Sequence, residues 1–358
     1  NPSTEFLSQY SRNQSTMKLI IFELSLNMSL LEVDQITCQM FFFKHFFSFI
    51  FLVSILTFCS CKNLKNEDNN SIKEIEVIRF EKLFFEYDFD SIKSLKKEFP
   101  YLFPKQFSID DWMSIYNDTL RRDIFDKSDK IFKNFNPFKT EISKNIKQIQ
   151  AEFGSFDMPK IITINNGIDY SYNIVRSDSL FLVSTDCYLG KNIHYKSIPN
   201  YISMKMNVDY FVKDITESLL VDFIKYPKDR RFISKIIYYG KIIYSMDKIT
   251  DFDLEQIIGI NQENINWLTE NEYEMWEYFV KNNLIFSTDI SLDKRFINDG
   301  PYSKFGLSID FESSPMVGKW IGYNIVKSYQ KKYDLELKNL VTMNEYDLYL
   351  KSNYSVRK

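Results

Sequence analysis

The hydrophobic residues between Asn207 and Lys225 recur every three or four positions. They are Val208, Phe211, Val212, Ile215, Leu219 and Phe223. This spacing gathers them on one face of an α-helix. Asn207 can cap the first turn, and Pro227 prevents the helix from continuing. The pattern therefore predicts a central helix with one buried face.

Similar patterns along the rest of the chain predict a mostly helical protein. Further helices are expected over 91–99, 108–132, 141–153, 231–246, 263–284 and 314–329, and Thr342 to Glu345 are expected to cap a last one. Ser108 and Asp111 have the spacing of a capping box. β-rich runs at 75–77, 160–164, 170–175 and 180–184 predict strands, and Asn166-Gly167 is typical of a hairpin turn. We expect an α+β fold with a small, mainly antiparallel sheet beside the central helix.

The first 74 residues differ from the rest in composition. Residues 1–39 are interpreted as an upstream extension that is not part of the mature protein. Residues 40–60 have a short basic start, an apolar run and a small residue before Cys61, which is typical of a lipoprotein signal peptide. Cys61 is then the predicted lipidation site, residues 61–74 are a polar, flexible tether, and 75–358 form a single domain. An uncleaved membrane anchor is the alternative, although the apolar run is short for a spanning helix.

Composition narrows the classes of function. The 358 residues are 44% hydrophobic, which is enough for a large core, and the net charge is −3 with both signs interspersed. Without a basic stripe, nucleic acid is not an expected partner. The nine glycines form no phosphate-binding motif, so no nucleotide and no other cofactor is expected.

Histidine and cysteine are scarce. His45 and His194 are the only histidines, and His45 lies in the predicted leader. Zinc sites with several His ligands and Ser-His-Asp hydrolases are hard to build with one histidine. After cleavage, Cys61 and Cys187 remain, and Cys187 is expected to be a small buried residue and not a nucleophile.

One segment of the central helix can be compared with a metal-binding motif. Thr216, Glu217 and Leu220 stand where H-E-x-x-H has its first His, its Glu and its second His. The His residues of that motif bind zinc and the Glu acts as general base. Only the Glu is present here. Taken alone, T-E-S-L-L is an ordinary helical sequence.

Several longer motifs resemble one family. They are the predicted lipobox at Cys61, RFEKLFFE at 79–86, IIYYGKIIY at 236–244, MWEYFV at 275–280, STDISLDKRFIN at 287–298, PYSKF at 301–305 and VGKWIGYNIVKSY at 317–329. Together they resemble the gliding-motility lipoprotein family GldB of Bacteroidetes over most of residues 61–358. That family is in turn similar to zincin-like metalloproteases, so the resemblance implies a zincin-like domain.

The resemblance also implies where a metal site would have been. The vestigial ligand positions fall on Thr216, Leu220 and Ile243, and the vestigial catalytic position falls on Glu217. Leu and Ile offer no lone pair and Thr is a poor ligand. We therefore expect no metal and a fold that has lost protease activity.

Three functional hypotheses follow. The first is a non-catalytic lipoprotein of the gliding apparatus, held in the membrane by lipid on Cys61, located in the cell envelope facing the periplasm or the surface, and binding other envelope proteins. The second is an active hydrolase in which Glu217 works with Asp214 or Asp222, which requires their pKa values to be driven apart. The third is a peptide- or glycan-binding receptor that uses the former protease cleft.

Overall fold

The computed structural model describes residues 75–86, 88, 91–177, 179–190 and 197–356. These residues form two compact units. Unit 1 is the described chain up to Asp126 together with Pro159–Ser184, and unit 2 is Lys127–Met158 together with the described chain from Thr185 onward. The predicted extension, signal peptide, Cys61, tether and His194 lie outside the described residues. The single domain expected over 75–358 stays a prediction.

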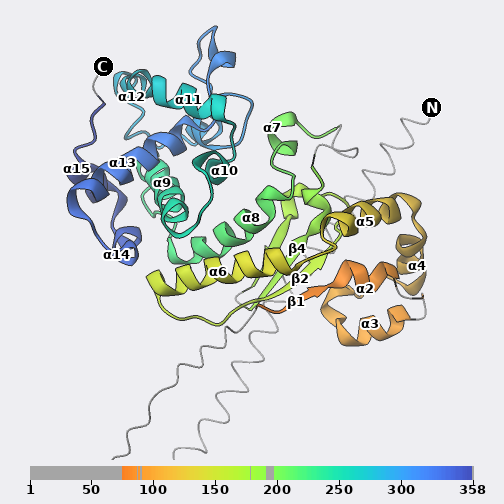
Figure 1. Cartoon of the computed structure of the whole chain (residues 1–358). Coiled ribbons are helices and arrows are strands. Elements are labelled where there is room, and N and C mark those ends of the chain that lie inside the picture. Colours follow the sequence, from red (N-terminus) through yellow and green to blue (C-terminus); the bar gives the residue numbers. More distant parts are fainter. Residues whose placement is uncertain (1–74, 87, 89–90, 178, 191–196, 357–358) are drawn as a thin grey trace, which may run out of the picture. The chain divides into compact units, whose positions relative to one another are not determined.

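Unit 1 contains a four-stranded sheet, and Figure 1 labels three of its strands. Its strands are β1 (Val77–Arg79), β2 (Lys160–Ile164), β3 (Ile174–Arg176) and β4 (Leu180–Ser184), in the order β1-β2-β4-β3. The pairs β1/β2 and β2/β4 are parallel, and only β3/β4 is antiparallel. The expectation of a mainly antiparallel sheet was wrong. The central strands β2 and β4 are mostly apolar and are buried along nearly their whole length, as is typical of parallel strands.

The hairpin predicted at Asn166-Gly167 does not form. β2 runs parallel to its neighbour β4, and the chain passes through a 3₁₀ turn, η4 (Tyr170–Tyr172), before β3 begins. The side chain of Asn166 donates to the backbone carbonyls of Asp169 (3.0 Å) and Tyr172 (3.1 Å). Asn166 therefore stabilises a longer connection instead of a two-residue turn.

The helices of unit 1 follow the sequence in part: the helix expected over 91–99 forms, the region expected over 108–132 is divided at Asp118, and the helix over 80–86 was not predicted. They are α2 (Phe80–Glu86), α3 (Ile92–Glu98), η3 (Pro100–Leu102), α4 (Ile109–Asn117) and the first part of α5 (Thr119–Ile131). The capping box is present: Ser108 Oγ accepts from the Asp111 N–H at 3.1 Å, and Asp111 Oδ2 accepts from the Ser108 N–H at 2.8 Å.

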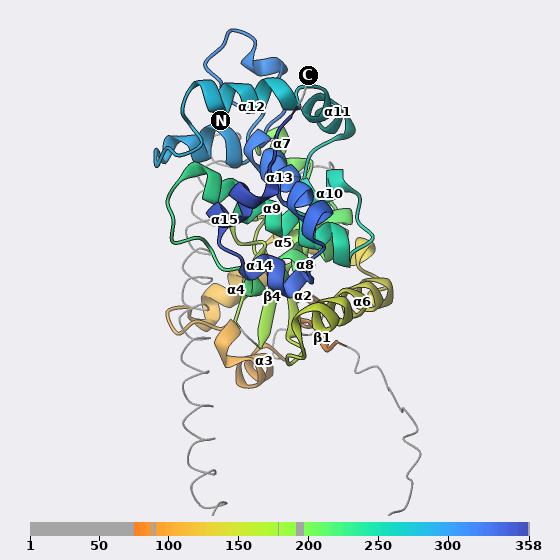
Figure 2. The same ribbon diagram turned by 90° about the vertical axis from the view of Figure 1, so that its left-hand side faces the viewer.

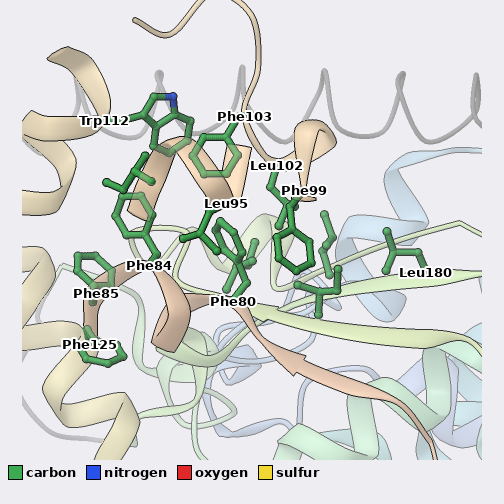
Figure 3. Close-up of a cluster of buried hydrophobic side chains, with 14 residues drawn as sticks. Phe80, Phe84, Phe85, Leu95, Phe99, Leu102, Phe103, Trp112, Phe125 and Leu180 are labelled. Carbon is green, nitrogen blue, oxygen red and sulfur yellow. The ribbon is translucent and has the colours of Figure 1, made fainter. Parts of the chain in front are cut away.

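Aromatic side chains fill the core of unit 1 (Figure 3). Phe80 and Phe84 from α2 meet Phe99, Phe103 and Trp112, with the Phe103 and Trp112 ring centroids 4.8 Å apart. Rings at these separations add to the free energy gained from burying their area. The RFEKLFFE segment therefore serves as the core-forming helix of this unit.

Unit 2 is helical. Its elements are α6 (Asn136–Phe153), η5 (Thr185–Tyr188), α7 (Asn200–Ser203), α8 (Asp209–Leu220), η6 (Val221–Phe223), α9 (Phe232–Ile249), α10 (Leu254–Ile258), α11 (Gln262–Glu270), α12 (Glu272–Lys281), a π-helix η7 (Asp293–Ile297), η8 (Asp310–Glu312), α13 (Val317–Tyr333), α14 (Leu337–Thr342) and α15 (Glu345–Ser352). α9 packs against α8, α13 and α15, and α6 packs against α8 (Figure 2). The mostly helical α+β class is confirmed.

Two helix ends in unit 2 differ from the predicted ones, and an asparagine lies at each of them. The helix expected over 263–284 is divided at Asn271, whose side chain donates to the carbonyl of Trp267 at 2.8 Å and competes with helical continuation. The last helix is capped by Asn344, which accepts from the N–H groups of Tyr346 and Asp347. Across the described residues, no helix is both long enough and apolar enough to cross a membrane.

Candidate functional site

The central helix predicted over 207–225 is α8, followed by the turn η6. Asn207 lies just before the helix, where its Oδ1 accepts from the N–H of Asp209 at 2.9 Å. Phe211, Ile215 and Leu219 are buried, as the spacing predicted. The regular helix ends at Leu220, several residues before Pro227.

The three vestigial ligand positions lie in packed surroundings. Thr216 is buried, and its Oγ1 donates to the Val212 carbonyl (2.8 Å) and accepts from Asn145 Nδ2 on α6 (3.0 Å). Leu220 on α8 and Ile243 on α9 are buried hydrocarbon side chains. These residues do not fit zinc, because they offer one hydroxyl that is already hydrogen-bonded on both sides. Among the described residues, no three His, Cys, Asp or Glu side chains are grouped to hold a metal ion.

Glu217 forms an ion pair on the adjacent face of α8. Its carboxylate accepts from Nζ of Lys213, one turn earlier in the same helix. The Lys213 side chain is only 9% exposed, whereas that of Glu217 is 36% exposed. Lys213 Nζ also lies 3.4 Å from Oδ1 of Asp214, and Oδ2 of Asp214 accepts from the hydroxyl of Tyr188 at 2.9 Å. A buried ammonium therefore lies between two carboxylates.

Lys213, Asp214 and Glu217 shift one another's pKa values. Burial alone would raise the pKa of Glu217, but the ammonium of Lys213, with Lys319 and Lys205 farther away, holds it below its ordinary value. For Asp214, burial dominates and raises the pKa, although Lys213 offsets part of the effect. Burial works to lower the pKa of Lys213, yet Glu217 and Asp214 outweigh it and raise the pKa. Lys213 therefore stays protonated at neutral pH.

Two further lysines and a third carboxylate complete a charge network. It consists of Lys205, Lys213, Lys319, Asp214, Glu217 and Asp299, three positive and three negative side chains. Lys205 forms an ion pair with Asp299, and Nζ of Lys319 lies 5.3 Å from the ring centroid of Tyr239. Burial lowers the pKa of Lys319, partly opposed by Asp299 and Glu217. Lys205, Lys213 and Lys319 were not predicted from the sequence, although the i, i+4 spacing of Lys213 and Glu217 is a known signal for an ion pair.

A pocket of about 380 Å³ adjoins the network at Asp299. It is formed by four separate segments of unit 2: the start of α7, the connection from α10 to α11, the turn after η7 and the residues before α13. Its lining residues are Asn200, Tyr201, Met204, Gly259, Ile260, Asn261, Asn264, Asp299, Gly300, Pro301, Pro315 and Met316. A volume of this size lies within the range of small-molecule sites.

The other candidate residues are placed as follows. Cys187 is buried, as expected. Asp222 is exposed in η6. Cys61 lies outside the described residues, so its lipidation stays a prediction, as does the likeness to zincins.

Comparisons with known proteins agree with the motifs noted in the sequence. No curated protein and no solved structure matches the chain. The family model described as gliding motility protein GldB matches residues 62–356. This match covers most of the chain and associates it with gliding motility and the cell envelope. The chain belongs to the GldB family of gliding motility proteins.

Proposed function

We propose that this chain is a non-catalytic, lipid-anchored interaction module of the gliding apparatus, built on a degenerate metalloprotease fold. Lipid on Cys61 would hold it at a membrane of the cell envelope, and the folded part would bind other envelope components of the gliding machinery. Family membership supports the process. The state of Glu217 carries the argument against catalysis.

A general base works best when its pKa lies near the operating pH and when its carboxylate can reach the proton that it removes. Glu217 meets neither condition well. Its pKa is held below its ordinary value, and its carboxylate is engaged by the buried ammonium of Lys213. Breaking that contact would leave a largely buried positive charge with Asp214 as its remaining carboxylate partner. The pair is therefore better suited to stabilising unit 2 than to catalysis.

An exposed apolar loop supports the interaction part of the proposal. Leu307, Ile309 and Phe311 are 55%, 56% and 66% exposed within five residues. Asp310 holds the loop in shape, because its carboxylate accepts from the N–H groups of Gly306 (2.8 Å) and Leu307 (3.2 Å). Clustered apolar side chains on a constrained surface loop are typical of protein–protein contacts.

The test compares gliding speed and melting temperature for Glu217→Gln. We expect gliding to continue and stability to fall by about 1–3 kcal/mol, since Lys213 loses one of two charged partners. Glu270→Gln, which removes an exposed carboxylate on α11, is the matched control and should change neither readout. Loss of gliding by Glu217→Gln at an unchanged melting temperature would argue against the passive module.

One observation favours the hydrolase alternative. Asp214 has a raised pKa and Glu217 a lowered one, and two carboxylates whose pKa values are driven apart can act as acid and base. If the chain is a hydrolase, Asp214→Asn and Glu217→Gln should each lower the rate of hydrolysis by about 100- to 10,000-fold. Both variants would then stop gliding while remaining folded. Elemental analysis adds a second test, because one tightly held zinc per chain, lost on replacing Glu217, would support the protease.

A further inference from the structure

We propose that the pocket between α7, α11 and the start of α13 binds a neutral sugar, as a mono- or disaccharide unit of a larger glycan. The inference goes beyond the proposed function, because sugar binding in this pocket does not depend on whether Glu217 is catalytic. The proposal rests on the polar side chains, the apolar side chains and the charge balance of the pocket lining. All the lining residues belong to unit 2.

Apart from Asp299, the polar side chains that line the pocket are neutral and have hydrogen-bonding groups available to a ligand. Within the described part of the chain, the side-chain amides of Asn200 and Asn264 and the hydroxyl of Tyr201 make no hydrogen bond. Asn261 uses its Oδ1 to accept from the N–H of Asn264 at 2.9 Å, which leaves its NH₂ group available. Amides and hydroxyls both donate and accept. These amide and hydroxyl groups match the hydroxyls of a sugar, each of which also donates and accepts.

The rest of the lining is largely apolar. Ile260 and Met316 are buried, and Met204 and Pro315 also line the pocket. A lining with both apolar and polar side chains suits a pyranose ring, whose C–H groups form an apolar face and whose hydroxyls project from the rim. Tyr201 adds an aromatic ring to the lining.

The backbone is strained at Met316, which also lines the pocket. Met316 has φ 56° and ψ 31°, in the left-handed region that residues other than Gly, Asn and Asp rarely adopt. Strained residues concentrate at ligand sites, where the surrounding structure holds them. Here the strained residue joins the pocket to the first turn of α13.

The charge balance favours a neutral ligand. Asp299 is the only acidic residue in the lining, and Lys205 neutralises it through their ion pair. Lys205 is itself held over Gly259, since a Cβ on that glycine would lie 2.8 Å from Cδ of Lys205. An extended peptide is less well matched, because peptide binding by β-augmentation needs a strand edge and this pocket is built from helix ends and loops.

The experiment is ligand-observed saturation-transfer NMR on the purified chain. The probes are glucose, galactose, mannose, N-acetylglucosamine and disaccharides of these sugars, with glucuronate and trialanine as charged and peptide comparisons. We expect saturation transfer to at least one neutral sugar and none to trialanine. Each lost hydrogen bond should weaken binding about 3- to 10-fold, so the double variant Asn200→Ala with Asn264→Ala should weaken it about 10-fold or more.

Asn266→Ala is the matched control, because Asn266 lies on the same helix as Asn264 but not in the pocket lining. It should bind like the unmodified chain, and melting curves establish that all variants are folded. Three results would overturn the proposal: transfer to none of the neutral sugars, transfer to trialanine alone, or sugar binding that the double variant retains in full.

Discussion

Gly240 and Gly322 lie in backbone contact where α9 crosses α13. A Cβ atom on Gly240 would lie 2.2 Å from the carbonyl carbon of Gly322, and one on Gly322 would lie 1.8 Å from the carbonyl oxygen of Ile236. No real Cβ occupies such positions. Both glycines are therefore required by the close approach of two helices, and both fall in the motifs that resemble the family.

Gly322→Ala should destabilise unit 2. Alanine normally improves helix propensity by about 1 kcal/mol over glycine, but the clash with backbone atoms requires the helices to separate. We expect a net loss of about 1–3 kcal/mol or more, measured by denaturant unfolding. The exposed Lys331→Ala on the same helix is the control and should be nearly neutral. Equal stability of the two variants would show that the helices do not meet at this glycine.

Lys241 should stabilise unit 2 through a buried ionic contact. It is fully buried, and its ammonium donates to the carbonyls of Val341 (3.2 Å) and Met343 (2.5 Å) and to Oε1 of Glu345 (2.6 Å). Lys241→Met keeps the length of the side chain but leaves the Glu345 carboxylate without its cation. The expected cost is about 3–5 kcal/mol in unfolding free energy.

A second substitution separates the charge effect from packing. Glu345→Gln added to Lys241→Met removes the uncompensated carboxylate and should recover part of the lost stability. If the double variant is instead less stable than Lys241→Met by the full cost of Glu345→Gln alone, the two residues are not coupled.

Asp229 should make the free energy of unfolding depend on pH in the acidic range. The hydrogen bond from Arg231 is the main cause that holds the pKa of Asp229 down to about 2, and the hydroxyl of Ser234 adds to it. Because the folded pKa lies below the unfolded value of about 3.8, this contribution is present above pH 4 and is lost as the pH falls towards 2. We expect Asp229→Asn to cost about 1–2 kcal/mol at pH 6 and almost nothing near pH 2. Unfolding curves for Asp253→Asn, an exposed control, should keep the parental pH profile.

The loop with Leu307, Ile309 and Phe311 should contribute to partner binding and not to folding. Replacing all three by serine should reduce gliding and the recovery of crosslinked envelope partners. Stability should change by no more than about 0.5 kcal/mol, because the side chains are exposed. Ile290→Ser, which removes an apolar side chain that is 72% exposed outside the loop, is the control. Normal gliding by the triple variant would exclude this loop as a required contact.

Cys61 should carry the membrane anchor. Since residues 62–71 are too polar to hold a membrane, Cys61→Ser should block lipid attachment and normal processing. Incorporation of labelled fatty acid measures this directly, with the buried Cys187→Ser as control. Equal labelling of the Cys61→Ser protein and the unmodified chain would contradict the lipobox assignment.

The sequence by itself determined the principal helices and the buried face of α8. Phe211, Ile215 and Leu219 repeat at the helical period, and Ser108 with Asp111 forms its capping box from neighbours along the chain. These features depend on contacts within a few residues, so a local pattern is sufficient to predict them. The motifs around Gly240 and Gly322 likewise identified the family without any structure.

Only the tertiary structure decided which strands pair and which charges meet. β2 and β4 are both apolar runs, and nothing in either run distinguishes a parallel neighbour from an antiparallel one. The same holds for the site: Lys205 pairs with Asp299, 94 positions away, and Asn145 reaches Thr216 across 71 positions. Such contacts arise because helix packing brings distant segments together. The pocket lined by Asp299 likewise exists only after unit 2 has folded.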